Sequence, residues 1–564
     1  MKTKPLLFLA AILVSFAAQS QYNYDWAKRL AGSHTDWAYD IAVDNDGNVI
    51  SSGSFMISAD FDPSDAAEFN LTAADNDSHA YLSKLDADGN FVWAISLENA
   101  SSGRAVVTDA EGNIYAAGSF RESFDFDHGS GESIVSSNGM NDAYLAKYSP
   151  DGNLTWVKTF GSEGHDGIVR IAINEDGELA VCGYFVHTVD FDPGAGVAEL
   201  SVLGVPQQND IFISKFDTDG NFQWVHQMGG NSSQLVEDIV FDLDENVVAT
   251  GRFAAEMNCD PGVSDFTFDS NGSLDWNIFV SKLDNNGGFI WARRVDGNDN
   301  DIGYGVTVDS MNDIIYTGHF GLTADFDPGS GVSELTVSGS WYDIFVSKLD
   351  QDGNFIWAKR IGSDASDYGA SIAVDEMGSV YTTGYTSGVC DFDPGEGVAT
   401  DDWEGASDVF ISVLDTYGSY LWGQNFGAHE DDWGNAIVVK AGHFYVTGLY
   451  KNNYANFGDF DLMGAGNEDV FVFKLTYPWE DAVSENKDAN GIMLYPNPVS
   501  DLLTINTDDL YQISIIEPTG KTVCSSSLTN QLCELDVSQL ANGVYSIILF
   551  HGEKITQETF IVNH

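Results

Sequence analysis

The sequence predicts an all-β fold whose main body, residues 21–478, is a seven-bladed β-propeller. Two residue types recur in step along this body, and chance does not produce two ladders in register. Tryptophan returns at intervals of 63 to 68 residues, at Trp26, Trp93, Trp156, Trp224, Trp291, Trp357 and Trp422. Glycine keeps the same interval, at Gly53, Gly118, Gly183, Gly251, Gly318, Gly384 and Gly448. A content of 13% aromatic residues and 57 glycines is typical of short strands joined by tight turns.

Each repeat is predicted to form four short strands. In residues 357–422 the run SIAVD, the turn EMGS and the run VYTTGY indicate one hairpin. The preceding repeat shows a second hairpin, with DIFVSKLD at 343–350, the turn QDGN, and FIWAKRI at 355–361. A four-stranded unit cannot bury both faces alone, so the seven units should pack face to face in a closed ring. The tryptophan falls in the outer strand, where packing between blades is favoured over sugar stacking.

The two ends of the body complement each other. The first repeat begins with the strand YDWAKRL at 24–30, which has no hairpin partner before it. The last repeat ends in DVFVFKLTYP at 469–478 and lacks its tryptophan strand. We therefore expect residues 22–30 to close the last blade as its outermost strand, paired with 469–475.

The recurring pattern D-x-A-x-x-I-A-V-D-x-x-G-N-x-Y-x-x-G resembles the bacterial β-propeller repeat family. The resemblance covers about residues 22–478. It implies a fold and carries no activity, because propellers host unrelated functions.

The N-terminus predicts export. Lys2 and Lys4 precede an apolar run from Pro5 to Ala18, and Ala18-Gln19-Ser20 has the small-x-small form of a cleavage site, so residues 1–20 are predicted to be a signal peptide. No later run is long enough for a transmembrane helix, so no membrane span is expected. A net charge of −62 argues against nucleic-acid and anionic-membrane partners. That charge favours a well-solvated acidic surface, with cations as its counter-species.

A second module follows a polar linker at 479–491. Its separated motifs are Tyr495-Pro496-Asn497-Pro498, a turn with Gly520 and Lys521, and a late stretch with Gly543 and Tyr545. In order and spacing they resemble the type A C-terminal sorting domain of the type IX secretion system of Bacteroidetes, over residues 492–564. The resemblance implies an immunoglobulin-like β-sandwich that the secretion machinery reads, and a location at the outer-membrane surface or outside the cell. The alternative is a generic β-sandwich binding module.

An acidic tetrapeptide recurs in the predicted connection between the second and third strands of a blade. Asp-Phe-Asp-Pro begins at Asp60, Asp190, Asp325 and Asp391, and three blades depart from it. Clustered oxygens on bent backbone could hold calcium, whereas Asp side chains also cap turns, and capping is the favoured alternative. The candidate calcium ligands are Asp60, Asp62, Asp190, Asp192, Asp325, Asp327, Asp391 and Asp393.

No catalytic residues are predicted, because the sequence has no nucleophile, zinc or phosphate-loop motif. Two function classes remain. The first is a binding or adhesion module for an extracellular glycan or protein, which near-uniform blades favour. The alternative is an extracellular glycan hydrolase or lyase with acids contributed by different blades. Calcium is the only cofactor that the sequence suggests.

Overall fold

The computed structural model describes residues 22–476, except 65, 74–75, 98–99, 206–207, 271–274, 402, 404 and 452–453, and the strands between residues 492 and 562. All regular elements in these residues are β-strands, so the predicted all-β class is confirmed. Tyr24–Leu475 form one compact unit, and the C-terminal strands belong to another. In the described residues no helix is long and apolar enough to cross a membrane.

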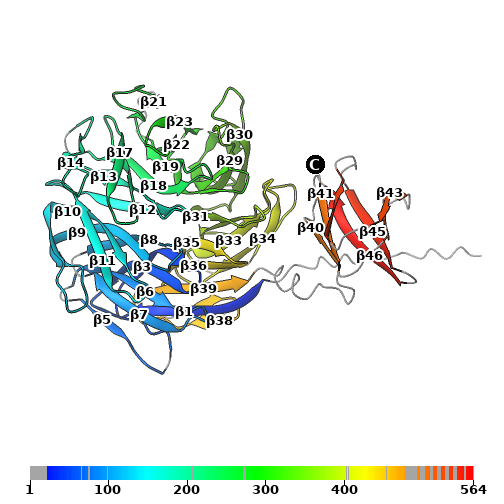
Figure 1. The fold of residues 1–564 in the computed structure, drawn as a ribbon, viewed down its shortest axis with the longest axis horizontal. Helices are drawn as coiled ribbons and strands as arrows, with labels where there is room; N and C mark the ends of the chain where they lie inside the picture. Colours follow the sequence, from blue (N-terminus) through cyan, green and yellow to red (C-terminus); the bar gives the residue numbers. More distant parts are fainter. Residues whose placement is uncertain are drawn as a thin grey trace, which may run out of the picture. The chain divides into compact units, whose positions relative to one another are not determined.

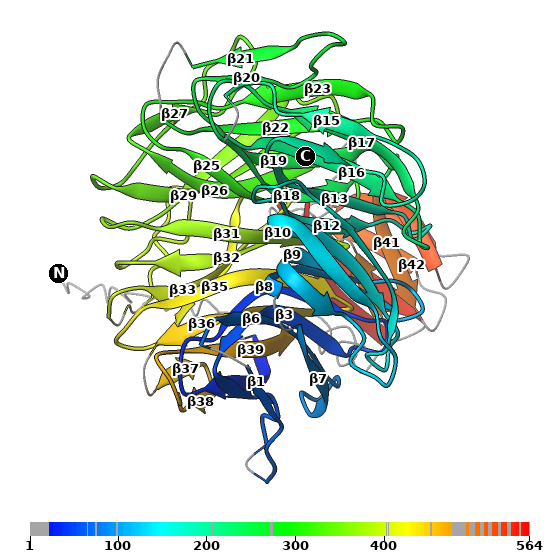
Figure 2. The same ribbon diagram turned by 90° about the vertical axis from the view of Figure 1, so that its left-hand side faces the viewer.

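The larger unit consists of seven antiparallel sheets that follow one another along the chain (Figures 1 and 2). Sheet 1 contains β2 (Trp37–Val43), β3 (Val49–Met56), β6 (Ser78–Leu85) and β7 (Phe91–Leu97). Sheet 2 contains β8 (Ala100–Thr108), β9 (Ile114–Asp125), β10 (Ile134–Tyr148) and β11 (Leu154–Phe160). Sheet 3 contains β12 (Gly167–Ile173), β13 (Leu179–Phe185), β16 (Asp210–Phe216) and β17 (Phe222–Met228).

The same order continues in the second half. Sheet 4 contains β18 (Gln234–Phe241), β19 (Val247–Phe253), β22 (Asn277–Leu283) and β23 (Phe289–Arg294). Sheet 5 contains β25 (Ile302–Val308), β26 (Ile314–Gly321), β29 (Tyr342–Leu349) and β30 (Phe355–Ile361). Sheet 6 contains β31 (Tyr368–Val374), β32 (Val380–Thr386), β33 (Asp408–Leu414) and β34 (Tyr420–Phe426).

Sheet 7 joins the two ends of the unit. Its order is β35 (Asp432–Lys440), β36 (His443–Lys451), β39 (Glu468–Thr476), β1 (Asn23–Gly32), β4 (Ser58–Asp60) and β5 (Asn70–Thr72). The N-terminal β1 is thus hydrogen-bonded to β39, as the sequence predicts, and the two strands lie side by side in Figures 1 and 2. The short pair β4–β5 extends this sheet although it comes from the connection inside sheet 1, which the sequence did not indicate.

Short outer ribbons form in the connections between second and third strands of sheets 3, 4, 5 and 7. They are β14 (Thr188–Asp190) with β15 (Glu199–Ser201), β20 (Glu256–Asn258) with β21 (Thr267–Asp269), β27 (Thr323–Asp325) with β28 (Glu334–Thr336), and β37 (Ala455–Phe457) with β38 (Phe460–Leu462). The two-residue strand β24 (Asp296–Gly297), from the connection between sheets 4 and 5, pairs with β27.

The first strands of consecutive sheets contact one another, and β35 of sheet 7 contacts β2 of sheet 1. Apolar side chains fill the space between neighbouring sheets. Ile50 and Leu82 of sheet 1 cluster with Val106 and Tyr144 of sheet 2, for example. The core is therefore divided into layers between sheets, as expected for units that cannot bury both faces alone.

Antiparallel order gives every sheet two different ends. The hairpin turns between first and second strands and between third and fourth strands lie at one end, here named the turn end. The longer connections, from second to third strand and from one sheet to the next, lie at the other, the loop end.

The glycine ladder is explained by a bulge in each first strand. In sheet 1 the register between β2 and β3 shifts between Ala38 and Asp40, so Tyr39 has no partner on β3. A Cβ on Gly53 would lie 1.9 Å from the carbonyl oxygen of Trp37. Each ladder glycine meets the carbonyl oxygen of its own first strand in this way, at 1.8 to 2.1 Å. Glycine is required there because the bulged strand occupies the space of a side chain.

The tryptophan ladder joins each sheet to the next. Trp93 of sheet 1 donates its indole N–H to the carbonyl of Pro150, in the second hairpin turn of sheet 2. The same bond is made by Trp26, Trp156, Trp224, Trp291 and Trp357, and all six distances lie between 2.9 and 3.3 Å. These side chains therefore serve packing between sheets, as the sequence favoured. Trp26 lies on β1 and bonds Ala87 of sheet 1, so this contact also closes the ring.

The C-terminal unit contains two antiparallel sheets. One has the order β40 (Ile492–Tyr495), β41 (Leu502–Thr507) and β44 (Leu532–Asp536). The other has the order β43 (Thr522–Ser527), β42 (Gln512–Ile516), β45 (Gly543–His551) and β46 (Lys554–Val562). Ile513, Ile515, Val537 and Ile547 are buried.

Candidate functional site

The predicted calcium loops are capped turns. Asp325 Oδ1 accepts the backbone N–H groups of Asp327 at 3.1 Å and Ser333 at 2.8 Å, and Asp327 Oδ1 accepts that of Gly329 at 2.8 Å. Phe326 between the two carboxylates is fully buried. The pairs Asp60 and Asp62, Asp190 and Asp192, and Asp391 and Asp393 make the equivalent bonds.

Each Asp pair occupies its own loop, so the eight predicted ligands do not converge. Among the described residues no three His, Cys, Asp or Glu side chains are grouped so that they could hold a metal ion. Two carboxylates whose Oδ1 atoms already accept backbone N–H groups are fewer oxygens than calcium takes. The hydrogen bonds are those that the capping alternative requires, and calcium binding stays a prediction.

A pocket of about 240 Å³ lies where the seven first strands meet. The bulge explains its lining, because the residue left unpaired in each first strand faces the common axis. These residues, one from each sheet in order, are Tyr39, Arg104, Val169, Glu237, Tyr304, Ala370 and Asn435. Trp37 and Trp433, at the loop end of the first strands, also line the pocket.

Hydrogen bonds hold the aromatic side chains of one side. The Trp433 indole N–H donates to Ser407 Oγ at 2.9 Å, and its ring stacks on Tyr385 with centroids 5.1 Å apart. The Trp37 indole N–H donates to the Glu468 carboxylate. The Tyr39 hydroxyl lies 3.3 Å from Ser54 Oγ. These rings are partly exposed and fixed in orientation, so they offer preformed flat apolar faces.

Two of the arginines near the axis are matched by acids. Arg170 Nε lies 3.9 Å from Asp238 Oδ1, and Arg252 Nη2 lies 3.2 Å from Glu237 Oε1. Burial raises the pKa of Asp238 to about 6 although Arg170 opposes the shift. Burial also raises the pKa of Glu237, against the opposing effect of Arg252. These pairs are structural first, because each acid needs its cation to remain charged at the axis.

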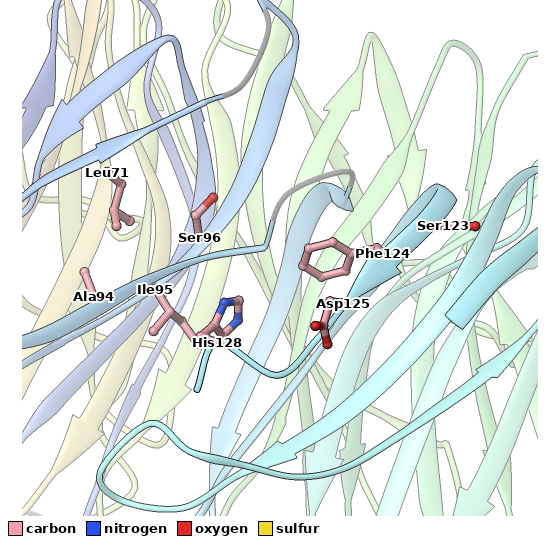
Figure 3. A pocket seen from close by; sticks show the side chains of 8 residues that line it. All are labelled: Leu71, Ala94, Ile95, Ser96, Ser123, Phe124, Asp125 and His128. Carbon is pink, nitrogen blue, oxygen red and sulfur yellow. The ribbon is translucent and has the colours of Figure 1, made fainter. Parts of the chain in front are cut away.

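A second pocket, of about 580 Å³, lies between sheets 1 and 2 near β7 and the end of β9 (Figure 3). His128, which occupies the proline position of the acidic loop, lines it with Ser96 and Asp125. Burial lowers the pKa of His128. In the part of the chain that the structure describes, no hydrogen bond joins Ser96, His128 and Asp125, so they do not form a nucleophile–base–acid arrangement.

Sequence reasoning missed the central pocket. It treated the blades as near-uniform, and the structure brings their differences to one place. The signal was the set of residues that directly follow the partner of each ladder glycine, where the chain has Tyr, Arg, Val, Glu, Tyr, Ala and Asn. Most of the predicted sorting residues, from Pro496 to Pro498 with Gly520 and Lys521, lie outside the described residues, while Tyr495, Gly543 and Tyr545 belong to β40 and β45.

Comparison with family models identifies two segments. Residues 493–563 match the secretion system C-terminal sorting domain. The chain carries a type IX sorting domain. Residues 356–391 match the β-propeller repeat. Such a sorting domain indicates that the protein is secreted through the type IX system to the cell surface or the extracellular space.

Two curated relatives match about two thirds of the chain. An uncharacterised WD repeat-containing protein of Acanthamoeba polyphaga mimivirus is 24% identical over 421 residues, which are 64% of this chain and 30% of that protein. The regulatory protein FlaEY of Caulobacter vibrioides is 23% identical over 394 residues, which are 65% of this chain and 38% of that protein. The chain thus spans about a third of the length of these relatives.

Solved structures resemble the chain only distantly. Sqt1 from Chaetomium thermophilum is 10% identical with a TM-score of 0.36, covering 76% of this chain and 97% of that one. The WD40 β-propeller domain of Doa1 is 10% identical with a TM-score of 0.24, covering 64% and 93%. These values are too low to support an argument about function.

Proposed function

We propose that the protein is a surface-displayed binding module whose ligand occupies the central pocket of a seven-bladed β-propeller. The proposal assigns residues 1–20 to a signal peptide, 21–478 to the propeller, 479–491 to a linker and 492–564 to an immunoglobulin-like sorting domain. Seven sheets with contacting first strands and a shared sheet 7 support the seven blades. Two sheets around Ile513, Ile515 and Ile547 support the sandwich.

One observation supports the binding role: the side chains that converge on the axis differ between neighbouring sheets. An axis lined by seven residues of six different types suits recognition of one asymmetric ligand, whereas identical blades would present a repeated surface. The pocket combines flat aromatic faces, a few polar groups and a preformed shape, which are the features of small-ligand sites.

The enzyme alternative needs two carboxylates free to act as acid and base. Glu237, which lines the pocket, is paired with Arg252. Asp40 and Asp238 lie behind the lining. Each accepts one backbone N–H group from its own strand and one from the first strand of another sheet. No free pair of carboxylates faces the pocket among the described residues. Binding is therefore favoured over hydrolysis or elimination.

A binding screen of the secreted protein against arrayed glycans and surface proteins tests the role. Ala370→Trp fills the pocket with a large side chain and should abolish any interaction made there. Val197→Trp is the matched control, because Val197 is 75% exposed on a loop outside the pocket. Equal binding by both variants would exclude the pocket as the site. New reducing ends or unsaturated products from a bound glycan would favour the enzyme alternative.

Surface delivery is tested separately. Deleting residues 492–564 should leave the protein out of the surface and medium fractions, because the sorting domain is the part that the secretion system reads. Fractionation followed by immunoblotting measures this. Normal delivery of the truncated chain would contradict the assignment of the sorting signal.

A further inference from the structure

Among the described residues, Arg104 lines the central pocket without forming an ion pair. Arg104, the bulge residue of sheet 2, is exposed toward the axis. Its guanidinium lies 4.8 Å from the centroid of the Tyr39 ring. Among the described residues its side chain makes no hydrogen bond or ion pair, although Glu237 lies within electrostatic range. This is notable in a chain with 86 acidic and 24 basic residues.

The residues around Arg104 hold it in position without forming an ion pair with its guanidinium. Arg170 Nη1 donates to the backbone carbonyl of Arg104 at 3.0 Å, which fixes that part of the bulge. The Tyr39 ring contacts the flat face of the guanidinium, so the N–H groups at the edge of the guanidinium can still donate to an acceptor. A guanidinium that is oriented and unpaired in a pocket is suited to a bidentate carboxylate.

We infer that the pocket binds the carboxylate of an acidic sugar residue, with Arg104 holding the carboxylate and the neighbouring aromatic rings facing the sugar ring. This deepens the proposed function and rests on it. Trp37 and Trp433 supply flat faces beside Tyr39, and Val169, Ala370 and Leu449 supply apolar lining. The apolar C–H face of a pyranose suits such rings, while its hydroxyl groups suit the Asn435 and Tyr304 side chains.

Size and charge narrow the ligand further. A volume of about 240 Å³ fits one sugar residue rather than a longer segment. With a net charge of −62 the protein repels long polyanions, so a single or terminal uronic acid is favoured. At physiological salt, surface charges more than about 8 Å from the ligand are largely screened. The electrostatic energy of a single carboxylate in contact with Arg104 is therefore set mainly by Arg104 and not by the acidic surface.

The experiment is isothermal titration calorimetry on the secreted protein. The probes are glucuronate and galacturonate, with glucose and galactose as neutral counterparts and N-acetylglutamate as a non-sugar carboxylate. We expect the uronates to bind and the neutral sugars to bind at least tenfold more weakly. Arg104→Gln should weaken uronate binding by about tenfold to a hundredfold, the effect of losing a charge-assisted hydrogen bond. Arg104→Lys should recover part of that affinity, because it keeps the charge without the fork.

Arg121→Gln is the matched control, since Arg121 lies in the same sheet, is exposed outside the pocket and pairs with Asp77. It should bind uronates like the natural chain. A thermal melt of each variant shows that it folds.

Equal affinity for glucose and glucuronate, unchanged by Arg104→Gln, would overturn the carboxylate assignment and leave the binding role intact. Binding of N-acetylglutamate without uronate binding would overturn the sugar assignment in favour of an acidic peptide. Absence of uronate binding would overturn the inference, while the Ala370→Trp screen judges the binding role independently.

Discussion

The two ends of the sheets differ in how they use aspartate. At the turn end Asp44 accepts two backbone N–H groups and the Asn48 amide, and it pairs with Lys84. Burial works to raise the pKa of Asp44, but these partners outweigh it and lower the pKa. At the loop end Asp301 is fully buried and accepts the N–H of Gly321, and burial raises its pKa to about 8. The same residue type is thus held charged at one end and neutral at the other.

The two ends therefore have different roles in the fold. The turn end repeats one clamp: a buried lysine on the third strand bonds the first turn of its own sheet and the second turn of the next. Lys282 Nζ lies 2.6 Å from Asp242 Oδ2 and donates to the Gln351 carbonyl oxygen at 3.1 Å. The Trp291 indole N–H donates to the same carbonyl oxygen. The loop end varies from sheet to sheet, and the pocket lies toward it. The repeated contacts of the turn end stabilise the ring, and the variable residues of the loop end contribute to the pocket.

The largest effect is expected from breaking the clamp. Lys282→Met leaves the buried Asp242 carboxylate without its cation and should destabilise the protein by about 3 to 5 kcal/mol in urea denaturation. Adding Asp242→Asn should recover part of the loss, because the uncompensated charge is removed. Sheet 6 has Val413 at the equivalent position, opposite Trp422, so an apolar side chain can be accommodated there. A loss below 1 kcal/mol would show that the clamp is not structural.

The raised pKa values at the loop end predict that the stability of the fold decreases as the pH rises. Burial raises the pKa of Asp36, Asp301 and Asp432 to about 8, and that of Asp367 to about 7. A raised pKa in the folded state means that folding favours the neutral carboxyl. The stability that these carboxyls add to the folded state is therefore complete below their unfolded pKa of about 3.9, and it is lost as the pH rises through 7 to 8. We expect the melting temperature to fall between pH 5 and pH 8.

Two variants sharpen that test. Asp301→Asn should flatten part of the slope, since sheet 4 already has the amide Gln234 at the corresponding position, two residues before the partner of the ladder glycine. Asp350→Asn, at the turn end, should leave the slope between pH 5 and pH 8 unchanged, because hydrogen bonds from Asn354 lower the pKa of Asp350 despite its burial. A melting temperature that rises over this range would contradict the neutral state of the loop-end carboxyls.

A smaller effect is expected at the tryptophan ladder. Trp291→Phe keeps a ring between the sheets but removes the N–H that bonds Gln351, so the loss should be about 1 kcal/mol plus that of the missing packing. Trp341→Phe is the control, because Trp341 is 61% exposed. Urea denaturation compares the two, and equal midpoints would remove the ladder's role in joining sheets.

The smallest effect is expected from calcium. Because the Oδ1 atoms of Asp325 and Asp327 already cap their turn, melting curves in millimolar calcium and in sodium chloride of matched ionic strength should coincide. Asn at both positions keeps an accepting oxygen, so that double variant should behave alike in both salts. A calcium-specific rise that the double variant loses would support the calcium hypothesis, at about 2.7 kcal/mol per site at a hundred times the dissociation constant.

Much of the architecture could be predicted because it is repeated in the chain. The Trp26 strand and its missing partner were sufficient to pair β1 with β39. The acidic tetrapeptide was equally visible, and it drew attention to capped turns rather than to a site. Arg104 and Glu237 passed unnoticed because each occurs once, at a position where no two neighbouring sheets agree. The residues that hold the ring together recur in every repeat or nearly every repeat, whereas those that face its axis do not recur from one repeat to the next.

Local pattern and order along the chain are sufficient to predict the strand repeat, the export signal and the sorting domain. Which side chains share a pocket depends on the tertiary structure instead. The bulge beside each ladder glycine turns one residue per sheet inward, and closure of the ring brings positions 39, 104, 237 and 304 around one axis. Their meeting depends on ring closure, which no single segment of the chain encodes.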